Sequence, residues 1–291
     1  KLPVKIILLL FILGIAGVIF FEIICLLIKP SFLISNYLSY NPVFGYSQVP
    51  NGKYNFEAFG ERIHIQFNSM GFRDVGHSFK KPAGVKRIVL IGDSFCEAVQ
   101  VNLEDTFFRR IEKKLNSNNG VKWEVINIGV GDFGTAQEWL ALTKIGFGYS
   151  PDIVLHQIFP LNDICNNSIG LYGLCKSPND RYRPYFIEAG KGLRLVSAQP
   201  IRSFLRRNFV SYRIIERAML EFIKRIGNSK LSEEQIRSIR LRRMGFPPLD
   251  PLLYTYVNDS QQISQVADGW KVTEKIIEDI EYEWVHINKH G

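Results

Sequence analysis

The sequence contains little cysteine and little histidine. Its 291 residues include four cysteines and five histidines. The cysteines do not have the spacing of a zinc site, and no pattern in the chain implies a metal or an organic cofactor. Cys165 and Cys175 are close enough in sequence to form a disulfide outside the cytoplasm; two buried free thiols are the alternative. Internal repeats are also absent, which excludes solenoid and propeller architectures.

Charged side chains are almost missing from Val4–Ile28, where only Lys5 and Glu22 interrupt an apolar run. A run of about 20 apolar residues is long enough to span a bilayer. It exceeds the apolar region of a secretory signal, and no small-residue cleavage site follows it. We therefore expect residues 4–28 to be a transmembrane signal anchor. Lys1 and Lys5 at the amino-terminal end of the run, against Lys29 at its other end, favour an inside amino terminus and a soluble domain outside the cytoplasm, periplasmic or extracellular.

Positive charge is concentrated in the segment 201–243. The whole chain carries a net charge of +8, and this segment holds twelve lysines and arginines against four acids. Anionic lipid headgroups and acidic polysaccharides are partners that such a segment attracts. The alternative is a solvated helical insertion whose apolar face packs on the core (Phe204, Phe209, Ile214, Ile215 and Phe222). We expect no nucleic acid partner for a domain outside the membrane.

Strands and helices alternate from residue 86 onward. The pattern predicts strands at Arg87–Ile91, Trp123–Ile128 and Ile153–Phe159, with helices at about 104–116 and 135–145 between them. Alternation of this kind is typical of β-α-β units in a parallel sheet. The expected class is therefore α/β.

Other segments surround these units. Residues 29–85 are expected to form an amino-terminal extension that packs on the domain, with one strand at Arg62–Phe67. A basic helical insertion interrupts the α/β domain 86–291 at about 166–260, and a helical pattern resumes from Ile263 to Asn288. The chain lacks an initial methionine and stops where a further strand is due. We therefore expect a fragment whose α/β domain is incomplete at its carboxyl end.

Three short polar segments each follow one of the expected strands. Gly92-Asp93-Ser94 follows the first strand, the glycine-rich stretch Gly129–Gly134 follows the second, and Asn162-Asp163 follows the third. The carboxyl ends of parallel strands meet at one edge of a sheet, where open α/β folds bind ligands. A serine hydroxyl, backbone N–H groups and an asparagine amide would converge there. Acyl transfer uses such groups, as a nucleophile and as donors to the oxyanion.

These segments resemble three sequence blocks of the SGNH/GDSL hydrolase family. Ser94 matches the family's nucleophile, Asn127–Gly134 is similar to its second block, and Asn162 matches its oxyanion-hole asparagine. Asn68–Asp74 resembles a segment that precedes the first block in membrane-anchored bacterial members. The resemblance covers roughly residues 40–170 and the helix near the carboxyl end.

The resemblance implies a flavodoxin-like three-layer α/β/α sandwich with a parallel sheet, and a serine esterase activity. In this activity Ser94 attacks an ester carbonyl. The N–H groups of Ser94 and of the Gly131-Asp132 turn, together with the Asn162 amide, hold the oxyanion. The implied substrate is an O-acyl group, in particular O-acetyl, on an envelope or exported glycan. The chain departs from the family pattern at Asp132 and Leu161, where the family usually has glycine.

Two other functions stay open, and so do purely structural roles for two of the site residues. The same groups serve an O-acyltransferase if a sugar hydroxyl, rather than water, accepts the acyl group. A degenerate hydrolase fold could instead bind glycan or act as an envelope scaffold without catalysis. Ser94 could merely cap the following helix, and Asn162 could be a turn residue. Asp93 and Asp163 are interpreted as structural.

The general base is not evident in the chain. The family uses Asp-x-x-His after a later strand, whereas Asp74-Val75-Gly76-His77 has this spacing but lies ahead of the serine. His64 and His156 fall in strand patterns and are interpreted as structural. His286 and His290 have helix-neighbour spacing and are interpreted as a solvated helix end. We therefore expect the base to lie beyond residue 291.

Overall fold

The computed structural model describes residues 4–28, 37–117, 120–167, 169–171, 182–190, 192–197, 200–227 and 269–282. The chain divides into two compact units. The first unit comprises Lys1–Ser35 with Gln199–Ile236, and the second comprises Asn36–Ala198 with Arg237–Gly291. Because the insertion is divided between them, its basic helices and its amino-terminal part belong to different units.

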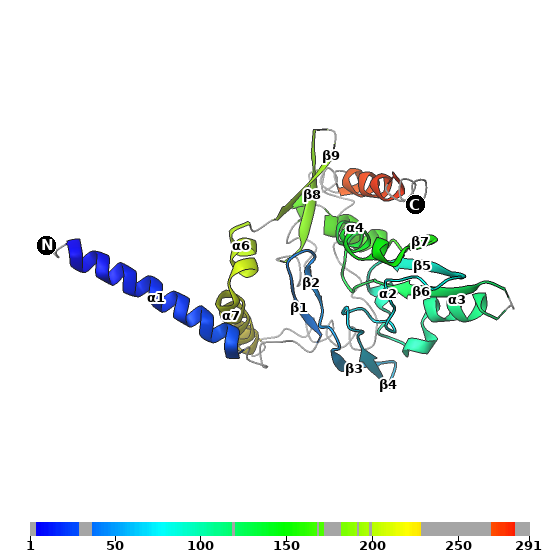
Figure 1. The fold of residues 1–291 in the computed structure, drawn as a ribbon, viewed down its shortest axis with the longest axis horizontal. Coiled ribbons are helices and arrows are strands. Elements are labelled where there is room, and N and C mark those ends of the chain that lie inside the picture. Colours follow the sequence, from blue (N-terminus) through cyan, green and yellow to red (C-terminus); the bar gives the residue numbers. More distant parts are fainter. Residues whose placement is uncertain are drawn as a thin grey trace. The chain divides into compact units, whose positions relative to one another are not determined.

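A parallel three-stranded sheet in the order β6-β5-β7 lies in the second unit (Figure 1). Its strands are β5 (Val85–Ile91), β6 (Lys122–Asn127) and β7 (Ile153–His156). The central strand β5 is buried at every residue except Lys86, as expected for a strand covered on both faces. The three predicted strands and the mixed α/β class are confirmed.

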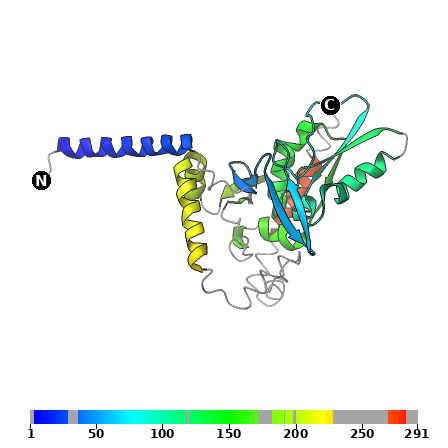
Figure 2. The same ribbon diagram turned by 90° about the horizontal axis from the view of Figure 1, so that it is seen from below.

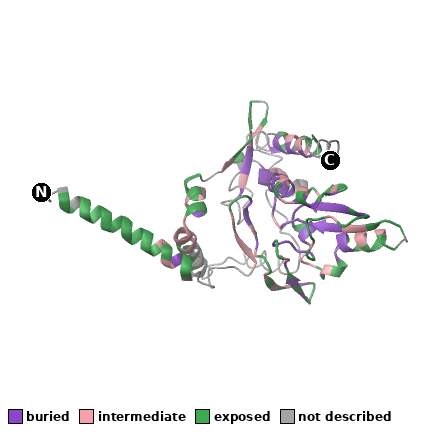
Figure 3. Ribbon diagram, viewed as in Figure 1, coloured by how far each residue is buried: buried purple, intermediate pink, exposed green. Residues whose placement is uncertain are grey.

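Helices cover both faces of this sheet (Figure 3). They are α3 (Phe107–Leu115), α4 (Thr135–Lys144) and a helix over residues 269–282. Ile88 and Leu90 of β5 pack in one core with α3, whereas Val89 and Ile91 pack in the other with α4 and the 269–282 helix. Successive side chains of a strand point to opposite faces, so one apolar strand supplies both cores. The flavodoxin-like assignment itself stays a prediction.

The third strand is shorter than the sequence pattern predicts. The Gln157 N–H donates to the Ile91 carbonyl at 2.9 Å, and the chain then turns into α5 (Pro160–Asn167). Among the described strands, β7 pairs with β5 alone, and β5 ends at Ile91. The apolar residues after His156 therefore have no described strand to pair with.

The extension contains two antiparallel hairpins instead of one strand. They are β1 (Leu38–Asn41) with β2 (Gly45–Gln48), and β3 (Lys53–Ala58) with β4 (Glu61–Gln66). The β3–β4 turn places Phe59 at φ 52° and Gly60 at φ 82°. Phenylalanine is uncommon in the left-handed region, so the sequence gives little sign of this hairpin.

Further elements complete the second unit: α2 (Ser94–Glu97), 3-10 turns at Leu103–Asp105, Gly146–Tyr149 and Ile169–Leu171, and the hairpin β8 (Pro184–Ala189) with β9 (Gly192–Ser197). The β8–β9 hairpin falls in the expected insertion and joins the core through the buried ring of Phe186. Cys165 is disulfide-bonded; Cys175, its predicted partner, lies outside the described residues.

Three helices make up the described part of the first unit: α1 (Val4–Ile28), α6 (Pro200–Asn208) and α7 (Val210–Gly227). α1 is long and apolar enough to cross a membrane. Figure 2 shows α7 starting at the carboxyl end of α1 and running across it. Three residues of the predicted apolar face of this segment, Phe204, Ile215 and Phe222, are exposed, and packing of this face on the core stays a prediction. Residues 228–243 of the basic segment lie outside the described residues.

Candidate functional site

Backbone hydrogen bonds bring the segments after the three strands together at one edge of the sheet. The Val130 N–H donates to the Gly92 carbonyl at 3.1 Å, which extends the pairing of β6 with β5 past both strand ends. On the other side, Gln157 donates to Ile91 at 2.9 Å. The glycine-rich turn and the β7–α5 loop therefore flank the segment that contains Ser94, as the parallel topology predicts.

Glycine is required at two positions of this edge because the chain segments approach too closely for a side chain. A Cβ atom at Gly92 would lie 2.4 Å from Sγ of Cys96, and one at Gly129 would lie 2.3 Å from Cβ of Cys96. Cys96 itself is fully buried, and burial raises the pKa of its thiol. Its role is therefore packing beneath α2, since a reactive cysteine needs an accessible thiolate.

Ser94 is the first residue of α2, and its side chain is exposed. The capping residue is Asp93, whose Oδ1 accepts from the Phe95 N–H at 2.9 Å. Within the described part of the chain, no residue hydrogen-bonds the hydroxyl or the N–H of Ser94. The alternative that Ser94 is the helix cap is therefore wrong, and one residue presents both a hydroxyl and an N–H donor at the sheet edge.

The glycine-rich turn places Asp132 at φ 65°, in the left-handed region. This conformation costs a non-glycine residue about 1 kcal/mol, and the resembled family has glycine here. Arg183, which is fully buried, donates to the Asp132 carbonyl at 2.7 Å and pairs with Oδ2 at 3.2 Å. The Tyr46 hydroxyl donates to the same carbonyl at 2.6 Å. These contacts stabilise the turn in the left-handed conformation, which aspartate adopts more readily than most non-glycine residues.

The Gly131 N–H donates to Oε2 of Glu97 at 2.5 Å. It is therefore unavailable to an oxyanion, contrary to the sequence prediction. The other carboxyl oxygen of Glu97 accepts from the Tyr37 hydroxyl at 2.7 Å. Glu97 is fully buried, and burial raises its pKa. Through these contacts Glu97 connects α2, which begins at Ser94, to the glycine-rich turn and to the extension.

Asn162 lies in the first turn of α5, which begins at the same sheet edge. Its side chain is outside the described part of the structure, so its oxyanion role stays a prediction. The neighbouring Asp163 is fully buried, and its Oδ2 accepts from the Phe159 N–H at 2.7 Å. Burial, with Glu138 close by, raises the pKa of Asp163 to about 9. Asp163 thus holds the β7–α5 loop, as predicted, and is protonated at neutral pH.

A further buried carboxyl lies beneath the site, on α4. Glu138 is fully buried, and its Oε2 is 2.7 Å from Nε2 of His156. Burial, with the charge of Asp93 nearby, raises the pKa of Glu138 well above its usual value. Burial also lowers the pKa of His156 to about 4. Glu138 and His156 therefore form a hydrogen-bonded pair, which is the kind of contact expected of a structural histidine.

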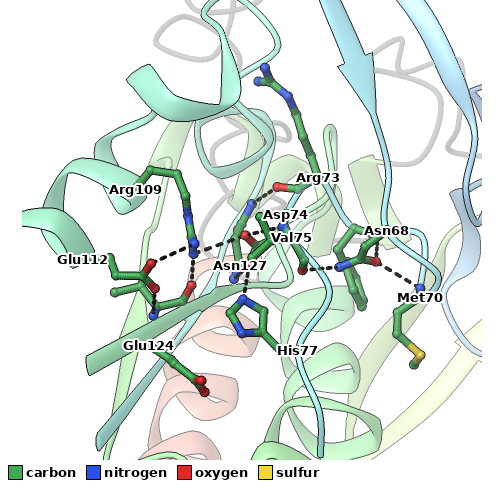
Figure 4. A network of polar contacts seen from close by, with 12 residues as sticks. Asn68, Met70, Arg73, Asp74, Val75, His77, Arg109, Glu112, Glu124 and Asn127 are labelled. Carbon is green, nitrogen blue, oxygen red and sulfur yellow. Dashed lines mark hydrogen bonds and ion pairs between the residues drawn. The ribbon is translucent and has the colours of Figure 1, made fainter. Parts of the chain in front are cut away.

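Asp74 and His77 form a close pair, with Oδ2 and Nε2 3.3 Å apart (Figure 4). The Asp74 carboxylate also accepts from the Asn127 N–H at 2.8 Å and pairs with Arg109 at 3.1 Å. These contacts tie the extension to β6 and α3. Neither Asp74 nor His77 is hydrogen-bonded to Ser94. The Asp-x-x-His spacing therefore serves an anchor of the extension in this structure.

Sequence reasoning missed three polar residues of the site, of which Glu97 and Arg183 are buried. Glu97 reads as an ordinary helix residue, and Arg183 lies in what looked like an insertion. Gln157, whose Oε1 accepts from the Asp93 N–H at 3.3 Å, was included in a strand. A polar residue at the end of an apolar strand is the one signal that could have identified Gln157. Glu97 and Arg183 carry no local signal.

Within the described ranges, no group of three His, Cys, Asp or Glu side chains is placed to hold a metal ion. Comparison of the chain with family models, curated proteins and solved structures gave no match. The resemblance to SGNH/GDSL hydrolases therefore depends on the sequence segments alone.

Proposed function

We propose that this chain is a membrane-anchored serine esterase of the SGNH/GDSL type that removes O-acyl groups from an envelope or exported glycan. The observation that carries the proposal is Ser94, an exposed serine placed directly after the central buried strand β5. No described residue occupies its hydroxyl or its N–H. A nucleophile and an oxyanion donor on one residue are what acyl transfer requires.

In the proposed reaction, Oγ of Ser94 bonds to the ester carbonyl carbon while its proton passes to a general base. The Ser94 N–H and the Asn162 amide donate to the oxyanion. The sugar alcohol then leaves with the proton, and water cleaves the acyl-enzyme to release the acid. The Gly131 N–H has no part in this scheme because Glu97 engages it.

The base is a histidine that the described residues do not supply at Ser94. His156 is bonded to Glu138, His77 is paired with Asp74, and Nδ1 of His64 is 2.6 Å from Oδ1 of Asn55. His286 and His290 lie outside the described residues. The proposal therefore requires an imidazole in addition to the three described ones, which makes labelling of the serine its most direct test.

The proposed location follows from α1. We propose that α1 is a single-pass anchor in the cytoplasmic membrane, with the second unit on the outer side near its glycan substrate. A flavodoxin-like sandwich is the finer fold that we propose for the second unit, since its parallel sheet has helices on both faces.

The test is labelling of the full chain in isolated membranes with a fluorophosphonate, which phosphonylates activated serines, alongside an assay of acetate release from an acetylated glycan. Ser94→Ala should abolish labelling and lower turnover by a factor of about 1,000 or more. Ser117→Ala is the matched control, because Ser117 is exposed and lies after α3. Labelling that persists in Ser94→Ala, or is absent from the unsubstituted chain, would contradict the proposal.

A non-catalytic glycan-binding role is the second candidate. Two observations favour it: no described histidine contacts Ser94, and the Gly131 N–H is engaged. This role predicts equal glycan binding by the unsubstituted chain and by Ser94→Ala, with no acid released by either. An O-acyltransferase is distinguished by transfer of the acyl group to an added acceptor glycan.

A further inference from the structure

The α6–α7 hairpin (Pro200–Gly227) presents an apolar surface that nothing in the described part of its unit covers. We propose that this surface lies in the lipid interface, beside the point at which α1 leaves the bilayer. The inference rests on the proposed membrane anchor and adds a second membrane contact to it.

The exposed face of α7 is apolar along its described length. Ile215, Met219 and Phe222 are 48%, 58% and 64% exposed. Their spacing of four and then three residues places them in one stripe of the helix. On α6, Ile201 and Phe204 are 75% and 61% exposed. Large side chains of this kind on a soluble surface usually mark a contact with a partner or a membrane.

A charged residue of α1 fixes where this surface lies relative to the bilayer. The Glu22 carboxylate accepts from the backbone N–H groups of Val210 and Ser211, the second at 3.0 Å. These groups belong to the first turn of α7, whose positive dipole end stabilises a carboxylate. Cys25, one turn further along α1, is buried. The start of α7 is therefore held against the last two turns of α1 (Figure 2).

The depth of this attachment suits an interfacial helix. The apolar stretch of α1 ends at Leu27, five residues after Glu22, which is about 8 Å along the helix axis. Interfacial amphipathic helices bury their apolar face about 5–10 Å into the boundary between headgroups and acyl chains. α7 also runs across α1 and not along it, which is the direction required of a helix in the membrane plane (Figure 2).

The charges of the hairpin match an anionic lipid surface. Arg202 and Arg207 of α6 are exposed. Arg206 is buried and pairs with both carboxyl oxygens of Glu216, at 2.7 and 2.6 Å, which joins α6 to α7. Basic residues beside an apolar stripe attract anionic headgroups while the stripe enters the acyl region. A polysaccharide would be attracted to the arginines but would leave the apolar stripe in water, so lipid is the occupant that fits both.

The experiment is photo-cross-linking of the full chain in nanodiscs of phosphatidylcholine and phosphatidylglycerol. Benzoylphenylalanine, which inserts into nearby C–H bonds, replaces one phenylalanine at a time, and adducts are identified by mass spectrometry. Phe222 is the test position. Phe59 in the second unit is the matched control, since it is 69% exposed against 64% for Phe222. Phe11 of α1, at 65%, reports on the anchor.

The proposal predicts lipid adducts at Phe222 at a level close to that at Phe11 and at least about tenfold above that at Phe59. Adducts between Phe222 and peptides of the second unit, or of another copy, would overturn it. So would a Phe222 yield equal to that of Phe59 while Phe11 still reacts with lipid; in that case the anchor stands and the interfacial helix does not. Absence of lipid adducts at Phe11 would overturn both.

Discussion

Asp163 is a buried carboxyl that the folded chain keeps protonated. Its pKa is raised from 3.8 to about 9 by burial and by the neighbouring Glu138. Between these two pH values the folded state holds a proton that the unfolded state has lost, so stability falls as the pH rises. At pH 7 the unfolded carboxyl lies about 3 pH units above its pKa, which corresponds to an upper limit of about 4 kcal/mol.

The perturbation is Asp163→Asn. The amide oxygen of asparagine can still accept from the Phe159 N–H, but the side chain no longer ionises. Thermal unfolding of the full chain in detergent, followed by tryptophan fluorescence from pH 5 to pH 8, measures the effect. We expect Tm of the unsubstituted chain to fall over this range and Tm of the variant to fall less. At pH 7 the variant should gain up to roughly 10 °C, at about 2–4 °C per kcal/mol.

Asp152→Asn is the control for this series. Burial would raise the pKa of Asp152, but Lys81 and the Arg87 N–H hold it below its usual value. The contribution of Asp152 is therefore present above its unfolded pKa and is lost only at lower pH, so this variant should keep the slope between pH 5 and pH 8. Equal slopes for Asp163→Asn and the unsubstituted chain would show that Asp163 is ionised in the folded state, which refutes the reasoning.

Three further predictions concern single positions. In denaturant unfolding, Gly129→Ala should destabilise the chain by about 2 kcal/mol or more, because the new Cβ would lie 2.3 Å from the Cβ of Cys96. Gly120→Ala is the control and should be nearly neutral, because no atom lies near the position of its Cβ. Ala98→Gly should stabilise the chain by about 1 kcal/mol in the same assay, since Ala98 has φ 49°; a loss of stability would contradict this. Burial lowers the pKa of His156 to about 4, so between pH 7 and pH 4 the unfolded state binds a proton that the folded state does not. The free energy of unfolding should therefore fall by about 3 kcal/mol over this range. His156→Gln should remove this part of the acid sensitivity.

Periodicity and hydropathy were enough to predict much of this chain. The apolar run predicted α1 from Val4 to Ile28, and alternation of apolar strands with amphipathic helices predicted the parallel sheet. Because parallel strands end at one edge, the sequence also predicted that Ser94 and the glycine-rich turn would meet there. These features depend on residues that are near one another in sequence or on rules of strand topology.

The partners of polar groups came only from the tertiary structure. Glu97 accepts hydrogen bonds from the Gly131 N–H and from the hydroxyl of Tyr37, which is 60 positions away in sequence. Arg183 donates to the carbonyl of Asp132, 51 positions away. Glu22 looked like a charge tolerated near the end of an anchor, yet it accepts the first amides of α7. Burial removes water from such groups, so each must be satisfied by whichever residue the fold places within about 3 Å. That residue is usually distant in sequence, and no local period specifies it.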